Sequence, residues 1–132
     1  NGYDTCIFLN EAGKIAEGPG SCFFMVKGDT LITPRLTDSV LESITRDTII
    51  KLATEELGLK FEERTIDRTE VYMADEAFLC GSAMEVTPIY TIDLYLIGTG
   101  EQGEVAKNIH LKYLECVQGK LQNRLNWLTP IY

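Results

Sequence analysis

The stretch EGPGSCFFMVKGDTLITP, from Glu17 to Pro34, decides the fold class of this 132-residue chain. Its apolar runs 21–26 and 30–33 flank a Lys-Gly-Asp turn, a pattern that predicts a β-hairpin. An acid, Glu17, stands directly before the Gly-Pro-Gly turn that leads into the first run. A surface hairpin does not need an acid at this point, so Glu17 indicates a site that holds positive charge at the edge of a sheet.

Segments on both sides of this hairpin predict further strands and helices. Short apolar or alternating runs predict strands at 60–64, 77–81, 85–93 and 94–97, and another hairpin at 5–9 and 13–16. Helices are predicted over 45–57, 68–76 and 104–117. Because hairpins come in groups with helices between them, the chain is predicted to be α+β, with a hairpin-rich sheet or pseudo-barrel and flanking helices.

The composition excludes several classes of function. With 45% hydrophobic and 24% charged residues, the chain is expected to fold as one globular domain. The net charge of -8 would repel nucleic acid, and no apolar run approaches the roughly 20 residues of a membrane span. The four cysteines include no C-x-x-C pair, which is typical of reduced thiols inside cells. We therefore expect a cytoplasmic protein without nucleic-acid or membrane partners.

A glycine-rich segment late in the chain, Gly98 to Gly103, matches the dinucleotide-binding pattern G-x-G-x-x-G. Too little chain follows the next helix to supply the returning strand of that fold, and Glu101 and Glu104 would repel the phosphates. We interpret the segment as a loop that enters a helix. The lone histidine, His110, has no Cys or His three or four residues away, so no metal site is expected there.

Two other loops carry groups that suit a ligand. The segment LESITRD (41–47) runs into the first helix, where the N–H groups of Ile44, Thr45 and Arg46 would attract a phosphate. The segment CGSAMEV (80–86) holds small residues that let a ligand approach the backbone, and Ser82 adds a hydroxyl group. Together with the acid before the Gly-Pro-Gly turn, these loops suggest a ligand that combines a cationic ring with a phosphate. Pyridoxal 5'-phosphate is such a ligand.

Three blocks of the sequence carry a resemblance to a known family: EGPGSCFFMVKGDTLITP, SITRDTIIKLATEELG and ADEAFLCGSAMEVTPI. In this order and spacing they resemble the large C-terminal domain of the branched-chain amino acid aminotransferases. These enzymes belong to the class IV (fold type IV) pyridoxal-phosphate family, which also includes D-amino acid aminotransferases and aminodeoxychorismate lyases. The resemblance covers essentially the whole chain, and the ending NWLTPI is similar too. It implies that residues 1–132 form one cofactor-binding domain.

The resemblance also implies roles for individual residues near the cofactor. Glu17 resembles the acid that pairs with the pyridinium nitrogen and keeps it protonated. Leu41 resembles a residue that packs against one face of the ring. Ile44 and Thr45 resemble the pair whose backbone N–H groups bind the phosphate.

The small-residue loop corresponds to the family's substrate side. Ser82, where the family usually has Thr, would add a hydroxyl group to the phosphate site, and the N–H groups of Ala83 and Met84 would bind the substrate carboxylate. Two positions depart from the family pattern: Cys22 stands where Asn is usual, and Ser43 stands where Gly is usual. These departures put the support of the acid and the freedom of the phosphate turn in question.

In the family, the Schiff-base lysine, a tyrosine, a phosphate-binding arginine and the small N-terminal domain all lie upstream of the matching segment. We therefore expect that this chain contains no catalytic residue, binds pyridoxal 5'-phosphate weakly and is inactive alone. The full-length protein is expected to be at least a dimer that transfers amino groups between branched-chain amino acids and 2-oxoglutarate. The alternatives are a D-amino acid aminotransferase or aminodeoxychorismate lyase domain, or a non-catalytic pseudo-enzyme that acts as an assembly module.

Overall fold

A computed structural model describes residues 5–35, 44–81 and 85–117 of the chain. Its strands are β1 (Glu17–Gly18), β2 (Ser21–Lys27), β3 (Thr30–Thr33), β4 (Lys60–Glu63), β5 (Glu76–Gly81), β6 (Glu85–Pro88), β7 (Thr91–Ile92) and β8 (Tyr95–Leu96). Its helices are α1 (Ile44–Lys51), the π-helical turn η2 (Leu52–Glu56), the 3₁₀ helix η3 (Arg68–Met73) and α2 (Glu104–Val117). Among these described helices, none is long and apolar enough to cross a membrane.

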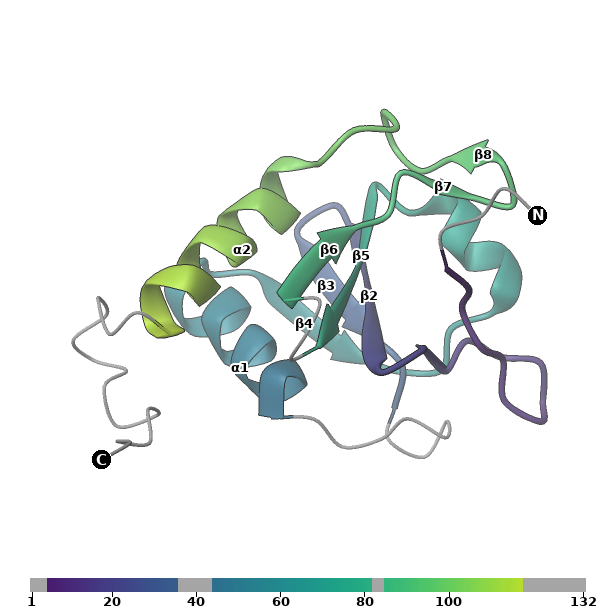
Figure 1. Cartoon of the computed structure of the whole chain (residues 1–132), viewed down its shortest axis with the longest axis horizontal. Helices are drawn as coiled ribbons and strands as arrows, with labels where there is room; N and C mark the ends of the chain where they lie inside the picture. The colour runs from purple at the N-terminus through teal and green to yellow at the C-terminus, as the bar shows by residue number, and fades with distance from the viewer. Residues whose placement is uncertain (1–4, 36–43, 82–84, 118–132) are drawn as a thin grey trace.

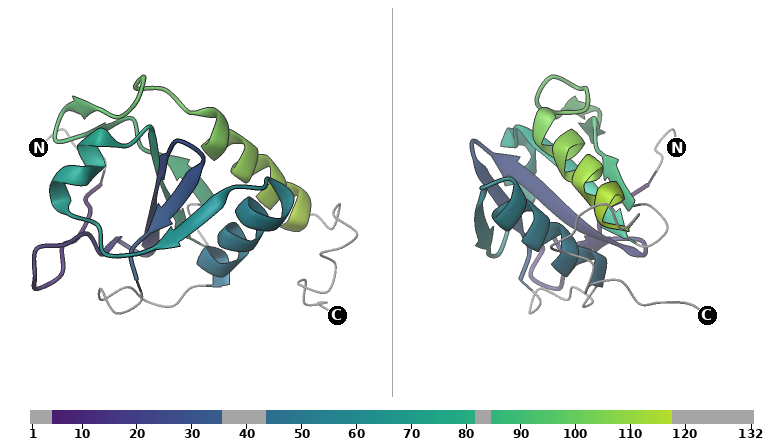
Figure 2. Two further views of the ribbon diagram at one scale, coloured as in Figure 1. Left: turned by 180° about the vertical axis from the view of Figure 1, so that it is seen from behind. Right: turned by 90° about the vertical axis from the view of Figure 1, so that its left-hand side faces the viewer.

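The strands form one main sheet and one small ribbon. The main sheet has the order β4-β3-β2-β5-β6, with β1 paired to β2, and every neighbouring pair is antiparallel except β3 and β4. Strands β7 and β8 form a separate two-stranded ribbon. Helices α1 and α2 lie side by side against one face of the main sheet (Figures 1 and 2). The predicted α+β class is confirmed.

Each face of the main sheet has its own apolar core. The cluster under α1 and α2, called here the helix-face cluster, consists of Cys22, Phe24, Val26, Leu31, Ile49, Ala53, Phe78, Cys80, Val86, Ala106 and Ile109. The opposite cluster consists of Ile15, Phe23, Met25, Ile32, Ile66, Val71, Ala74, Ala77, Leu79 and Ile97. Successive residues of β2 alternate between the two clusters, because side chains alternate across a strand. Burying each large side chain contributes about 1.5–3 kcal/mol.

The predicted central hairpin and the last helix are confirmed, and two other segments differ from expectation. The helix predicted over 45–57 is α-helical only to Lys51 and then widens into η2, where the Leu57 N–H donates to the Leu52 carbonyl. The hairpin predicted at 5–9 and 13–16 is present, with an antiparallel bridge between residues 9 and 15 and backbone hydrogen bonds from Phe8 to Glu17, from Ala16 to Phe8 and from Asn10 to Lys14, although it forms no regular strand ladder. The Ile15 N–H donates to the Ile66 carbonyl, outside the hairpin.

Candidate cofactor site

Glu17 lies on a backbone that is held from two sides. Strand β1 places Glu17 directly opposite Cys22 of β2. On the other side, the Phe8 N–H donates to the Glu17 carbonyl at 2.6 Å. The Glu17 residue is half-buried, and opposed residues of an antiparallel pair point to the same face of the sheet. Its side chain therefore stands on the face that α1 and α2 cover.

Glycines allow the turn after Glu17 to pack tightly against the end of β5. A Cβ atom on Gly18 would lie 2.6 Å from the Ser21 Oγ, and one on Gly81 would lie 2.7 Å from the Gly20 carbonyl oxygen. At Gly81 the obstructing atom belongs to the backbone, so only a residue without a side chain fits there. The Ser21 Oγ is buried and has no hydrogen-bond partner among the described residues. The turn thus packs closely against Gly81, the last residue of β5, and contains a buried hydroxyl, that of Ser21, without a hydrogen bond to the described residues.

The first turn of α1 is anchored by a buried arginine. The Arg46 side chain is 3% exposed, and its Nη2 donates to the Pro34 carbonyl at 3.2 Å and to the Glu63 carboxylate at 2.5 Å. Thr45 is also buried, whereas the Ile44 side chain is 88% exposed. Within the described ranges, no side chain accepts a hydrogen bond from the Ile44 or Thr45 N–H group. These donors fit the phosphate role that the sequence predicted.

The acid and the helix start belong to the same end of the sheet. Cys22 faces Glu17 across one strand pair and Cys80 across the other. The hydrogen bond with Cys22 and burial raise the pKa of the Cys80 thiol, and the Arg46 charge opposes this rise. In Figure 1 the start of β2, the end of β5 and the start of α1 lie together at the lower end of the sheet.

The residues at this end fit a pyridoxal 5'-phosphate group. The Glu17 carboxylate suits a protonated ring nitrogen, and helix N–H groups suit a phosphate. The glycines let the turn after Glu17 pack against the end of β5, and Arg46, paired with Glu63, anchors the first turn of α1. The other predicted site residues, Leu41, Ser82, Ala83 and Met84, lie outside the described residues. Of the predicted set, Glu17, Ile44 and Thr45 lie within the described residues.

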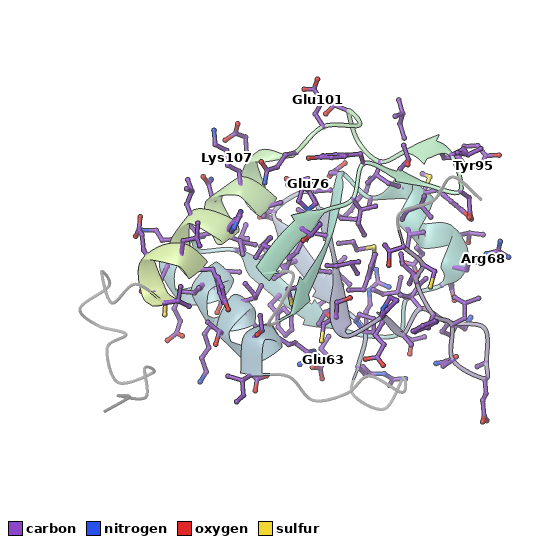
Figure 3. The ribbon with its side chains drawn as sticks, in the orientation of Figure 1. Glu63, Arg68, Glu76, Tyr95, Glu101 and Lys107 are labelled. Atoms are coloured by element: carbon purple, nitrogen blue, oxygen red, sulfur yellow. The ribbon has the colours of Figure 1, made fainter. Side chains whose placement is uncertain are left out.

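The glycine-rich segment before α2 is a loop, as interpreted from the sequence. The Val105 and Ala106 N–H groups donate to the two Glu76 carboxylate oxygens, at 3.1 and 2.8 Å. Figure 3 shows Glu76 between β5 and the start of α2. A Cβ atom on Gly103 would lie 2.0 Å from the Glu76 Cδ, so this glycine leaves room for the capping carboxylate. A phosphate would meet a negative charge at this helix start.

Neither the surroundings of His110 nor the cavity on the opposite face of the sheet contains the groups predicted to bind a cofactor. His110 is half-buried in α2, and the described part of the chain holds no group of three or more His, Cys, Asp or Glu that suits a metal ion. A cavity of about 490 Å³ lies on the opposite face of the sheet, where Ile7, Ile15 and Tyr72 contribute to its lining. This cavity contains none of the predicted site residues.

The sequence did not indicate two long-range contacts that anchor the starts of α1 and α2. Arg46 was recognised only as part of a helix start, and its partner Glu63 lies 17 residues further along the chain. Glu76 caps a helix whose first turn is 29 residues away. No local sequence pattern indicates either contact, because each joins elements that only the sheet brings together.

Comparison with known proteins identifies the family. The model of the family described as amino-transferase class IV matches residues 1–92. The probable branched-chain-amino-acid aminotransferase of Aquifex aeolicus is 46% identical over the whole chain, which spans 42% of that protein. The branched-chain amino acid aminotransferase of Thermobaculum terrenum, solved in its PLP-form, is 55% identical with a TM-score of 0.95 and matches 98% of this chain and 42% of its own.

A third relative was solved together with an amino acid. The branched-chain aminotransferase of the thermophilic archaeon Thermoproteus uzoniensis, solved with norvaline, is 44% identical with a TM-score of 0.92. It matches 99% of this chain and 43% of its own. The chain thus spans about two fifths of the length of these relatives, and their names favour the branched-chain branch over the D-amino acid and lyase alternatives. The chain belongs to the class IV aminotransferase family.

Proposed function

We propose that residues 1–132 form the C-terminal, cofactor-binding domain of a branched-chain amino acid aminotransferase. In the full-length protein this domain takes part in amino-group transfer between leucine, isoleucine or valine and 2-oxoglutarate. The observation that carries the proposal is the placement of Glu17 and the start of α1 at one end of one sheet face. The names of the most similar relatives support the branched-chain substrate class.

Each site residue has a distinct role in this proposal. When bound, pyridoxal 5'-phosphate supplies a ring that accepts electron density from the substrate α-carbon. Glu17 holds a proton at the pyridine nitrogen, because a nearby carboxylate favours the charged form of that atom. The Ile44 and Thr45 N–H groups hold the phosphate at the positive end of the α1 dipole. Leu41 packs on the ring.

The small-residue loop after β5 completes the site in this proposal. Ser82 donates its hydroxyl to the phosphate, and the Ala83 and Met84 N–H groups orient the substrate carboxylate. The lysine that removes the α-proton is contributed by a segment outside this chain, so the 132-residue chain alone binds the cofactor weakly and does not turn over. We further propose that the full-length protein is cytoplasmic and at least dimeric; the reduced state of all four cysteines supports the compartment.

The proposal is tested with Glu17→Gln in the full-length protein that contains this chain. Gln has the shape of Glu but no charge, so it cannot keep the ring nitrogen protonated. We expect transamination of L-leucine with 2-oxoglutarate to slow at least a hundredfold, about 2.7 kcal/mol in the barrier, while bound cofactor measured by absorbance falls far less. An unchanged rate would remove Glu17 from the mechanism.

Substrate class is tested with a panel of amino donors in the unmodified full-length protein. We expect turnover with L-leucine, L-isoleucine and L-valine and none with D-alanine. Turnover with D-alanine alone would contradict the branched-chain assignment. A protein that binds the cofactor but transfers no amino group from any donor would be a pseudo-enzyme.

A further inference from the structure

Two buried thiols face each other next to the candidate cofactor site. Cys22 is the second residue of β2, Cys80 is the last but one of β5, and the two are direct partners across this antiparallel pair. Both belong to the helix-face cluster, with 4% and 0% exposure. The next pair along the same face, Phe24 and Phe78, stacks with ring centroids 5.2 Å apart. Opposed side chains on this face are therefore in contact.

The spacing of the pair suits a disulfide. Opposed residues of antiparallel strands have Cα atoms about 4.5–5.5 Å apart, within the range of about 4.4–6.8 Å that a disulfide spans. Both cysteines are reduced, and a hydrogen bond joins the Cys22 and Cys80 thiols. We propose that Cys22 and Cys80 form an oxidation site at which a peroxide converts the thiol pair into a disulfide. This inference does not rest on the proposed function, because it needs only the two strands.

The reaction balances with hydrogen peroxide as the oxidant. The Cys22 thiolate attacks one peroxide oxygen, the O–O bond breaks, and Cys22 becomes a sulfenic acid as the other oxygen leaves as water. The Cys80 sulfur then attacks the Cys22 sulfur, which forms the S–S bond and releases the sulfenic oxygen as a second water. The two thiols lose two electrons and two protons, and hydrogen peroxide takes up both.

The order of the two steps follows from the burial of each thiol. Cys22 is 4% exposed and Cys80 is fully buried, so a small oxidant reaches Cys22 first. The hydrogen bond with Cys22 and burial also raise the pKa of the Cys80 thiol. The pair lies at the ends of β2 and β5, so a local opening of the strand ends admits a small oxidant. The bond would tie the start of β2, opposite Glu17, to the end of β5.

The test uses the purified protein with Cys6→Ser and Cys116→Ala, which leaves only the pair. After treatment with hydrogen peroxide, we expect the intact mass to fall by two hydrogens and the peptide map to contain Cys22 linked to Cys80. A mass that gains oxygen atoms, with no linked peptide, would overturn the proposal. The unmodified protein serves as a control for the substitutions. After the same peroxide treatment it is unfolded without reductant, and its peptide map shows which of the four cysteines are joined by a disulfide.

Two matched variants in the same background test the order of the steps. With Cys80→Ala we expect Cys22 to gain oxygen atoms, because no second thiol resolves the sulfenic acid. With Cys22→Ala we expect Cys80 to remain a thiol over the same period, because burial alone still raises its pKa. Faster oxidation of Cys80 than of Cys22 in these variants would contradict the assigned order.

Discussion

The two α-helices on the same face of the sheet begin in opposite ways. The N-terminus of α2 is closed by the Glu76 carboxylate, which accepts from Val105 and Ala106. At the N-terminus of α1, no described side chain accepts from Ile44 or Thr45, and Arg46 is buried in the same turn. One helix start is neutralised by a carboxylate of the chain itself, whereas at the other the Glu63 carboxylate pairs with the Arg46 guanidinium.

This difference between the two N-termini indicates which of them can bind an anion. A helix N-terminus attracts phosphate only while its N–H groups are available, and an internal carboxylate removes both the donors and the positive potential. The glycine pattern before α2 therefore does not suit a phosphate, whereas the start of α1 lies at the same sheet end as Glu17. Four predictions test this contrast, from the largest expected effect to the smallest.

Breaking the ion pair that anchors α1 has the largest expected effect. Glu63→Gln leaves the 3% exposed Arg46 guanidinium buried without its nearest carboxylate, so we expect a loss of about 3 kcal/mol in the free energy of unfolding, measured with urea. Arg46→Met removes the buried charge itself together with its contact to the Pro34 carbonyl. The Glu63 carboxylate that remains is 39% exposed and stays hydrated, so this variant should lose only about 1 kcal/mol. Equal losses would show that the pair does not anchor the helix.

Removing the cap of α2 has a smaller effect that leaves α1 intact. Glu76→Ala leaves the Val105 and Ala106 N–H groups without their acceptor, so we expect a loss of about 1–2 kcal/mol. Hydrogen exchange should speed up at these two amides and stay unchanged in α1. Glu76→Gln, which keeps an acceptor oxygen, should lose less. Unchanged exchange at both amides in the alanine variant would contradict the capping role.

Removing one donor from the start of α1 should affect ligand binding and hardly affect stability. Ile44→Pro deletes the first N–H of the helix, at a position where proline suits helical geometry. A lost hydrogen bond to a charged group costs about 1.5–3 kcal/mol, so we expect affinity for pyridoxamine 5'-phosphate to fall about tenfold or more. Ile44→Ala, which keeps the N–H, is the matched control. Equal affinities of the two variants would place the phosphate elsewhere.

A third helix start, that of η3, gives the smallest effect and a pH dependence. The Glu70 carboxylate accepts from the Asp67 N–H and pairs with Arg64, and the Arg64 hydrogen bond lowers the pKa of Glu70. This contribution to stability is present above the ordinary pKa and is lost as the pH falls through the lowered one. We expect Glu70→Gln to lose less than about 1 kcal/mol at pH 7 and nothing at the lowest pH. A pH-independent difference between the two proteins would contradict this role.

Local patterns predicted the parts of the fold that local interactions decide. The hairpin of β2 and β3 follows from two apolar runs around a Lys-Gly-Asp turn, and α2 occupies residues 104–117 as its periodicity indicated. Segment 5–16 forms its predicted hairpin without a regular ladder, because the Ile15 N–H donates to the carbonyl of Ile66, which lies about fifty residues further along the chain. In the candidate site, Glu17 was predictable from its place before a glycine turn. The anchoring of Arg46 was not, because its partners join it only through the folded sheet.

The central claim is that one end of the helix-covered face binds the cofactor. It is tested most directly by titrating the ¹⁵N-labelled chain with pyridoxamine 5'-phosphate, which lacks the aldehyde that would react with lysines, and following the amide signals by NMR. The account predicts concentration-dependent shifts at Glu17, Ile44, Thr45 and Gly81, and weaker shifts for Glu17→Gln. Shifts confined to the cavity on the opposite face, or no shifts at millimolar ligand, would contradict it.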